Sequence, residues 1–253
     1  MTPPAYTPAR DIASKIRRRL TQWRAAKPAQ LRFAQPMLSI CFDDFPASAA
    51  AAGAQTLEQH GARGTYYAAA GLREADGDCG LNFSAADLTR LVASGHEIGC
   101  HTFAHADCAQ RQTFDTLCDI AANRDALGAM GCAAPPVTLA YPFGETTDQL
   151  KSALPPRYKC ARGILPGLNI GRVDLMQLRA YPLFGEGAFD RAVTTLKRAA
   201  RRNAWMIVFT HDVSDSPSPW GTRTAELTAL LLAARSAGVA VTTVSAALSR
   251  RLQ

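Results

Sequence analysis

The feature that most constrains the fold is a regular alternation of short apolar runs and longer helical stretches after residue 36. The apolar runs have strand length and occupy residues 37–42, 64–68, 96–100, 137–141, 206–210 and 239–244. The helical stretches lie between them, at residues 47–60, 85–93, 113–130, 189–202 and 224–237. This alternation predicts parallel strands joined by helical crossovers. Residues 145–188 show no clear period and are expected to be irregular.

Polar motifs follow directly after several of the predicted strands. They are Asp43-Asp44, His101 to His105, Pro142-Phe143-Gly144, and His211-Asp212. In a closed parallel barrel the carboxyl ends of the strands share one face, where active sites assemble. We therefore expect these motifs to meet at a single site.

The residue types of the first two motifs favour a divalent metal site. Asp43 and Asp44 are adjacent carboxylates after an apolar run, which is a costly arrangement unless a cation lies beside them. His101 and His105 are four residues apart, a spacing that brings two imidazoles onto one face of a helical turn. One carboxylate and two histidines would hold an ion with open positions, and the second carboxylate would remain available for proton transfer.

Composition excludes some classes of protein. With 253 residues, 47% hydrophobic and 19% charged, the chain can form a sizeable core and does not have the profile of a disordered protein. The formal net charge is +7, concentrated near residues 15–27 and 197–202. These basic clusters are not interleaved with aromatic residues, so nucleic acid is not the expected partner.

An N-terminal extension, residues 1–36, is predicted to carry a basic amphipathic helix at residues 10–26. Ile12, Ile16, Leu20 and Trp23 repeat at helical spacing among basic residues. The helix could pack on the domain with a solvated basic back, or it could lie on an anionic membrane surface.

The location expected for this chain is the cytoplasm, with a possible membrane association. Its amino end has no apolar core of signal-peptide length, and no run approaches the ~20 residues of a membrane span. The seven cysteines include no CxxC pair and are expected to be reduced structural thiols.

Four motifs together resemble the polysaccharide deacetylase family, also called the NodB homology domain or carbohydrate esterase family 4. The family's T-F-D-D motif is similar to Cys41-Phe42-Asp43-Asp44, and its paired-histidine motif is matched by His101-Thr102-Phe103-Ala104-His105. The segment Ala140-Tyr141-Pro142-Phe143-Gly144 resembles the third motif, and Ile207 to His211 resembles the last. The matches run from about residue 37 to 245, and the resemblance implies one domain, residues 37–253, folded as a distorted (β/α) barrel with about seven parallel strands.

The resemblance also implies roles for individual residues. Asp44, His101 and His105 would hold a divalent metal, most often Zn²⁺. Asp43 would act as the catalytic base, His211 would protonate the leaving amine, and the backbone N–H of Phe143 would stabilise the oxyanion. Tyr141, Pro142 and Trp220 are expected to contact the substrate, an N-acetylated glycan in polymeric, oligomeric or lipid-linked form.

One departure from the family pattern concerns the arginine that braces the base aspartate. Its position in the third motif is taken here by Ala140. Arg162 or Arg179 could replace it, and otherwise the pKa of Asp43 would be set in another way. The departure leaves open a catalytically impaired carbohydrate-binding protein on the same fold. A two-histidine, one-carboxylate iron oxygenase is a further alternative.

Overall fold

The computed structural model describes residues 11–252, and its centre is a curved sheet of parallel strands. In sheet order the strands are β10 (Tyr181–Pro182), β11 (Trp205–Thr210), β2 (Met37–Asp43), β3 (Thr65–Ala68), β6 (Glu97–Cys100), β7 (Thr138–Ala140) and β8 (Cys160–Arg162), and β14 (Ala240–Val241) also pairs with β2. Every pair in this sheet is parallel. An isolated parallel bridge joins Arg162 at the end of β8 to Leu178, which precedes β10. The prediction of a distorted barrel with about seven parallel strands is confirmed.

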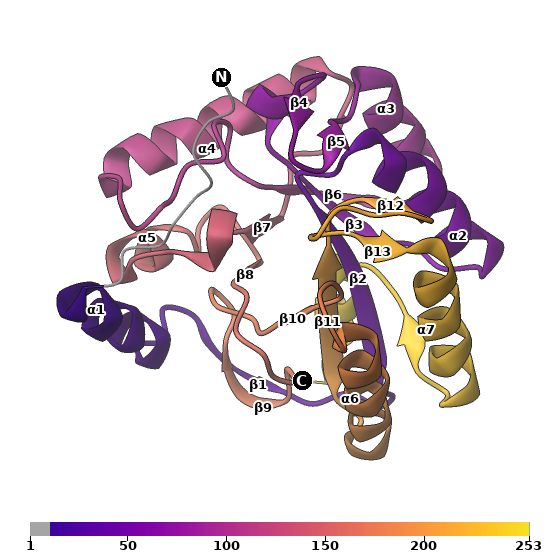
Figure 1. Cartoon of the computed structure of the whole chain (residues 1–253). Helices are drawn as coiled ribbons and strands as arrows, with labels where there is room; N and C mark the ends of the chain where they lie inside the picture. Colours follow the sequence, from indigo (N-terminus) through magenta and orange to yellow (C-terminus); the bar gives the residue numbers. More distant parts are fainter. Residues whose placement is uncertain (1–10, 253) are drawn as a thin grey trace.

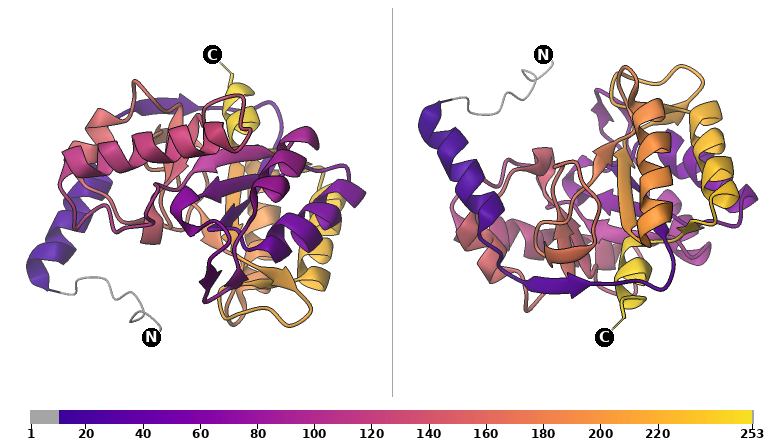
Figure 2. Two further views of the ribbon diagram at one scale, coloured as in Figure 1. Left: turned by 90° about the horizontal axis from the view of Figure 1, so that it is seen from above. Right: turned by 90° about the horizontal axis from the view of Figure 1, so that it is seen from below.

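Helices cover the outside of the curved sheet (Figures 1 and 2). The helices α1 (Ile12–Trp23) and α8 (Val244–Ser249) are not part of this outer layer. It consists of the π-helical turn η1 (Ala49–Gly53), α2 (Ala54–Gln59), α3 (Ala85–Ala93), α4 (Thr113–Ala129), α5 (Asp148–Ala153), α6 (Ala188–Arg202) and α7 (Thr224–Ser236). Both α3 and α4 pack on β6, and α6 packs on β11 and β2. These helices are the crossovers that the sequence pattern predicts, since parallel neighbours need a connection that returns to the same end of the sheet.

Strand β2 shows why the two sides of the sheet are both apolar. All seven of its residues are buried, as expected for a parallel strand covered on both faces. Leu38, Ile40 and Phe42 join the core beneath the outer helices, whereas Met37 and Cys41 join the core inside the barrel. Because side chains alternate along a strand, Asp43 belongs to the inner set. The register of β2 thus directs one carboxylate into the barrel.

The segment expected to be irregular, residues 145–188, contains regular structure. It holds α5, β8, β10 and β9 (Gly171–Asp174). The strands have two to four residues, too few for a period to be seen in the sequence. The last predicted strand is also corrected, because only Ala240–Val241 is extended and Val244 already begins α8.

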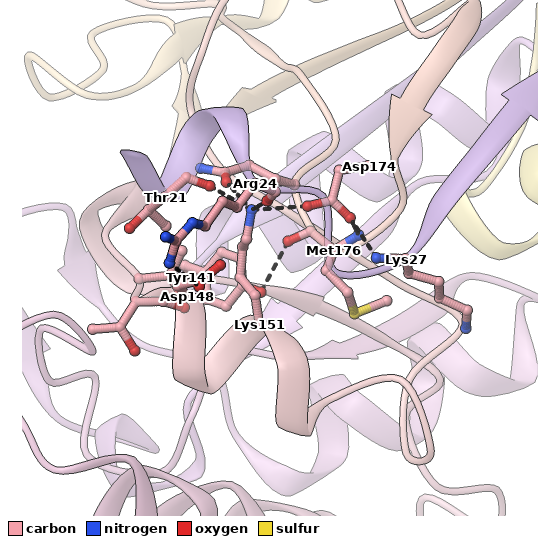
Figure 3. A network of polar contacts seen from close by, with 11 residues as sticks. Thr21, Arg24, Lys27, Tyr141, Asp148, Lys151, Asp174 and Met176 are labelled. Carbon is pink, nitrogen blue, oxygen red and sulfur yellow. Dashed lines mark hydrogen bonds and ion pairs between the residues drawn. The ribbon is translucent and has the colours of Figure 1, made fainter. Parts of the chain in front are cut away.

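The N-terminal segment is attached to the domain at two places. Strand β1 (Pro28–Leu31) pairs antiparallel with β9, and Leu31 is fully buried. Farther upstream, α1 lies beside α5, where the ammonium group of buried Lys151 lies within hydrogen-bond distance of four acceptors and shares its three N–H groups among them (Figure 3). These acceptors are the carbonyls of Thr21 (2.5 Å) and Arg24 (2.6 Å), Asp174 Oδ2 (2.8 Å) and Gln177 Oε1 (2.9 Å). This Lys151 network fixes the C-terminal turn of α1, where a cation is favourable to the helix dipole.

Substituting Lys151 is expected to destabilise the protein strongly. In Lys151→Met, Asp174 and two helix carbonyls lose a fully buried partner, which costs about 3–5 kcal/mol. Urea unfolding followed by circular dichroism measures this loss. Lys159→Met, at an exposed lysine, is the matched control and should change the free energy of unfolding by less than about 0.5 kcal/mol. Equal effects of the two substitutions would contradict the structural importance of the Lys151 network.

Two smaller pairs complete the fold, β4 (Asp76–Gly77) with β5 (Gly80–Leu81), and β12 (Val213–Ser214) with β13 (Thr222–Arg223). All seven cysteines are free. Within residues 11–252, no helix combines the length and the apolar character needed to cross a membrane.

Candidate metal centre

The motifs that follow the predicted strands meet at the carboxyl ends of β2, β6 and β7. Asp44 follows β2, while His101 and His105 follow β6. Four residues of these loops have left-handed backbones, namely Asp44 (φ 56°), Thr102 (φ 61°), His105 (φ 49°) and Phe143 (φ 58°). Such conformations cost non-glycine residues about 1–3 kcal/mol each and cluster at functional sites. The local strain therefore indicates that the positions of these side chains matter.

Asp44, His101 and His105 form a compact cluster. Their potential ligand atoms all lie within 4.8 Å of one another. Asp44 Oδ1 is 3.2 Å from His105 Nε2 and 3.6 Å from His101 Nε2. This oxygen is nevertheless buried without a hydrogen-bond partner. A buried acceptor facing two imidazole nitrogens is satisfied when a cation binds between the three atoms.

The protonation states of the cluster also suit a cation. Burial lowers the pKa of His101 to about 3 and that of His105 to about 4, so both rings are neutral at pH 7, the form that ligates metals. Burial raises the pKa of Asp44 to about 7, and the nearby Asp43 carboxylate contributes to the rise, while His211 opposes it. A divalent ion would offset the cost of ionising Asp44. The donor set therefore fits a metal with N and O ligands such as Zn²⁺.

Neighbouring groups orient the two histidines. His101 Nδ1 lies 2.8 Å from the carbonyl oxygen of Ala140, which can only accept, so Nδ1 carries the proton and Nε2 has a free lone pair. The loop between the histidines is held by Asp119 on α4, which accepts from the backbone N–H of Phe103 at 2.7 Å. Asp119 carried no motif signal, and only the proximity of α4 reveals its role.

Asp43 is not one of the three clustered ligands, although its charge acts on both histidines, and it pairs with Arg162. Both side chains are buried inside the barrel, and the guanidinium group donates to Asp43 Oδ1. Burial, the largest single influence, would raise the pKa of Asp43, but the charge and hydrogen bond of Arg162 together with the charges of His101 and His211 hold that pKa below its ordinary value. Arg162 is itself packed against the rings of Tyr67 and Phe209, with centroids at 4.7 and 5.0 Å. Asp43 therefore remains ionised at neutral pH.

The position of Arg162 explains how Asp43 is paired with an arginine although residue 140 is an alanine. Ala140 on β7 and Arg162 on β8 are register partners in adjacent parallel strands. Directly paired residues point to the same side of a sheet, so an arginine at either position reaches the same interior. Of the two arginines considered from the sequence, Arg162 supplies the brace. Arg179 instead donates to the carbonyl of Pro166.

His211 and Trp220 lie on the other side of the site. His211 is close enough to Asp43 and Asp44 that its charge lowers the pKa of both, against the larger effect of burial. Its Nδ1 lies 3.1 Å from the Trp220 carbonyl, so Nδ1 donates and Nε2 is left for other partners. Trp220 is half-exposed, and Phe184 contacts both His211 and Trp220 edge-on. The Phe143 ring approaches His105, with centroids at 4.7 Å.

Two of the three predicted substrate contacts, Tyr141 and Pro142, have buried side chains. Tyr141 is buried, and its hydroxyl donates to the Met176 carbonyl at 2.9 Å. Pro142 is buried as well. A side chain enclosed in the core cannot stack on a sugar, so neither ring offers a stacking surface to a substrate. Their place next to the third motif could not reveal this, because burial depends on the neighbouring segment around Met176.

A cleft of about 440 Å³ opens between the segment after Asp44 and the loop after His211. Its polar lining consists of Ser48, Asp78, Cys79, Asp212, Ser214, Ser216 and Ser218. Asp212 is buried and accepts from the backbone and the hydroxyl of Ser218, which holds the loop in place. The cleft is thus a shaped, hydroxyl-rich surface beside the cluster.

The fold and the site together define an α/β half-barrel with a candidate metal centre at the carboxyl ends of its strands. Residues 31–155 match the family model described as "Polysaccharide deacetylase". This part of the chain, which contains the acidic and histidine motifs, belongs to the polysaccharide deacetylase family, and the resemblance noted from the motifs is confirmed.

Solved structures share the same fold. The structure "T48 deacetylase with substrate" superposes with a TM-score of 0.61 at 16% identity, covering 85% of this chain and 92% of its own. A family 4 carbohydrate esterase from Streptomyces lividans in complex with acetate gives 0.58 at 15% identity, covering 88% and 98%. A family 4 acetyl xylan esterase from Clostridium thermocellum with a cobalt ion gives 0.57 at 21% identity, covering 84% and 90%. No significant match was found among curated protein sequences.

Proposed function

We propose that this protein is a metal-dependent hydrolase that removes N-acetyl groups from an acetamido sugar of a glycan. The observation that carries the proposal is the cluster of Asp44, His101 and His105 next to an acid that belongs to a different ion pair, Asp43 with Arg162. The two neighbouring carboxylates thus have separate partners. This arrangement suits Asp44 for binding an ion and Asp43 for accepting a proton. Acetate in the Streptomyces lividans structure and cobalt in the Clostridium thermocellum structure support the same chemistry.

Asp44, His101 and His105 would hold the ion, with Zn²⁺ as the favoured metal. When bound, such an ion acts as a Lewis acid that acidifies a water ligand and polarises the amide carbonyl. Asp43, kept ionised by Arg162, would accept the proton of the attacking water. His211 would donate a proton from Nε2 to the departing amine, and the backbone N–H of Phe143 would stabilise the oxyanion. The products would be acetate and a free amino sugar.

The cleft beside the cluster supports a sugar as the substrate. Its serine hydroxyls and the carboxylate of Asp78 are the groups that hydrogen-bond to sugar hydroxyls. Trp220, half-exposed and backed by Phe184, would provide an apolar ring for one face of the sugar. Because the cleft is open, a residue within a polymer, an oligomer or a lipid-linked glycan would fit.

An acetate-release screen tests this function. The full chain is incubated with free, polymeric and lipid-linked acetamido sugars, with and without a chelator, and acetate is measured enzymatically. We expect release from at least one class, loss of release with the chelator, and recovery when Zn²⁺ or Co²⁺ is restored. Glycan binding without acetate release from any substrate would instead favour a carbohydrate-binding protein that has lost its chemistry.

Removing one predicted ligand should weaken metal binding before it affects the fold. In His105→Ala the cluster loses one of three donors, and the partly accessible side chain leaves no large cavity. We expect metal affinity to fall by more than about 100-fold, with acetate release falling in parallel. Isothermal titration with Zn²⁺ measures the affinity. His60→Ala, at an exposed histidine outside the cluster, is the control and should bind Zn²⁺ like the unmodified protein. Unchanged affinity in His105→Ala would contradict the assignment.

A further inference from the structure

Four large apolar side chains of α1 face solvent rather than the domain. Ile12, Ile16, Leu20 and Trp23 are 76%, 54%, 46% and 79% exposed. Their spacing of four, four and three residues aligns them along one side of the helix, and we call this set the apolar stripe. The other exposed large hydrophobic residues of residues 11–252 are scattered over other elements. A contiguous stripe of this kind marks an interaction surface, whereas single exposed residues do not.

Polar contacts fix α1 in this orientation. Among the side chains of α1 that the structure describes, Ser14 and Thr21 are buried, and the Lys151 network holds the C-terminal turn of the helix. Arg18 donates to Glu145 at 2.7 Å, from the side of the helix that meets the domain. A surface helix ordinarily buries its apolar side and exposes its polar side. In α1 the arrangement is reversed, so packing on the domain through the apolar residues, one of the two interpretations of the sequence, is wrong.

The charge of the helix indicates what covers the stripe. The twelve residues of α1 include Lys15, Arg17, Arg18 and Arg19 and no acid. Arg19 is exposed, and Arg24, just after the helix, is exposed while pairing with Asp148 at 3.1 Å. Exposed cations beside an apolar stripe with a tryptophan are typical of helices that lie in the interface of an anionic membrane. A second copy of this chain would bring two basic helices together, which is electrostatically unfavourable.

We infer that α1 is a peripheral membrane anchor whose apolar stripe inserts into the surface of an anionic phospholipid bilayer. The helix lies at the edge of the molecule in every view, so a flat surface can reach it (Figures 1 and 2). The Lys151 network couples the anchor rigidly to the domain. This inference does not depend on the proposed deacetylase activity.

Vesicle sedimentation with the full chain tests the inference. We expect binding to vesicles that contain phosphatidylglycerol, weaker binding at high salt, and little binding to phosphatidylcholine alone. The triple variant Ile12→Ser, Ile16→Ser, Trp23→Ser should lower the partition coefficient by roughly tenfold or more, because it removes the inserted apolar area. Phe114→Ser on α4 is the matched control, since Phe114 is 75% exposed outside the stripe, and it should bind like the unmodified chain.

Tryptophan fluorescence provides an independent measurement. Trp205 is fully buried, so in a Trp220→Phe background Trp23 is the exposed indole, and its emission should shift to the blue with anionic vesicles. Absence of lipid-dependent sedimentation would overturn the inference, as would equal sedimentation of the triple variant. A lipid-free dimer that the triple variant converts to a monomer in light scattering would also overturn it, by showing that a second copy covers the stripe. Acetate release does not enter these readouts, so they are independent of the catalytic proposal.

Discussion

Asp43→Asn is expected to lower the rate of acetate release by about 10²–10⁴-fold while the metal remains bound. The amide has the size of the carboxylate and can still accept from Arg162, but it cannot take a proton from water. The predicted ligands Asp44, His101 and His105 are unchanged, so metal content should not fall. Acetate release and metal analysis on the same preparation give both values.

A paired variant separates the two carboxylates. Asp44→Asn removes a negative ligand and should lose metal and activity together, whereas Asp43→Asn should lose activity alone. Circular dichroism on both variants verifies that each is folded, because Asp43→Asn leaves the buried guanidinium of Arg162 without a counter-charge. Full turnover by Asp43→Asn would remove Asp43 from the role of base and leave the metal cluster without an assigned proton acceptor.

Arg162→Met should be the most destabilising substitution in the site. It leaves the Asp43 carboxylate buried inside the barrel without its partner, which costs about 3–5 kcal/mol. Arg179→Met, at an exposed arginine, is the control and should change the free energy of unfolding by less than about 0.5 kcal/mol. Urea unfolding measures both.

Arg162→Met should also change how stability and activity depend on pH, in a defined direction. With Arg162 present the pKa of Asp43 lies below its ordinary value, so the pair stabilises the fold above that value and loses its contribution as the pH falls. Without Arg162, burial dominates and the pKa of Asp43 rises. The acid limb of the activity profile should therefore move to higher pH in Arg162→Met, a shift that a purely structural residue would not produce.

Transplanting the arginine tests whether the position on β8 replaces that on β7. Because Ala140 and Arg162 are register partners, Ala140→Arg combined with Arg162→Ala should recover part of the stability and restore the acid limb. Arg162→Ala alone should show the full loss of stability and the displaced acid limb. If the double variant behaved like Arg162→Ala, the two positions would not be interchangeable, and the brace would depend on the packing of Arg162 between Tyr67 and Phe209.

The long elements could be predicted from the sequence because their patterns repeat. Helix α4 and strand β11 were expected within a residue or so of their observed bounds. The short strands β8, β9 and β10 could not be predicted, because two to four residues are too few to show a hydrophobic period. The proximity of Asp44, His101 and His105 was likewise predictable, because each follows a parallel strand and the carboxyl ends of such strands meet.

The sequence by itself determined the alternation of strands and helices, the motifs at the strand ends and the amphipathic character of α1, because these are local properties of the chain. Only the tertiary structure decided that Arg162 rather than Arg179 holds Asp43, that Tyr141 lies in the core, and that the apolar stripe of α1 faces outward. Each of these outcomes depends on contacts between segments far apart in the chain, which local patterns do not encode.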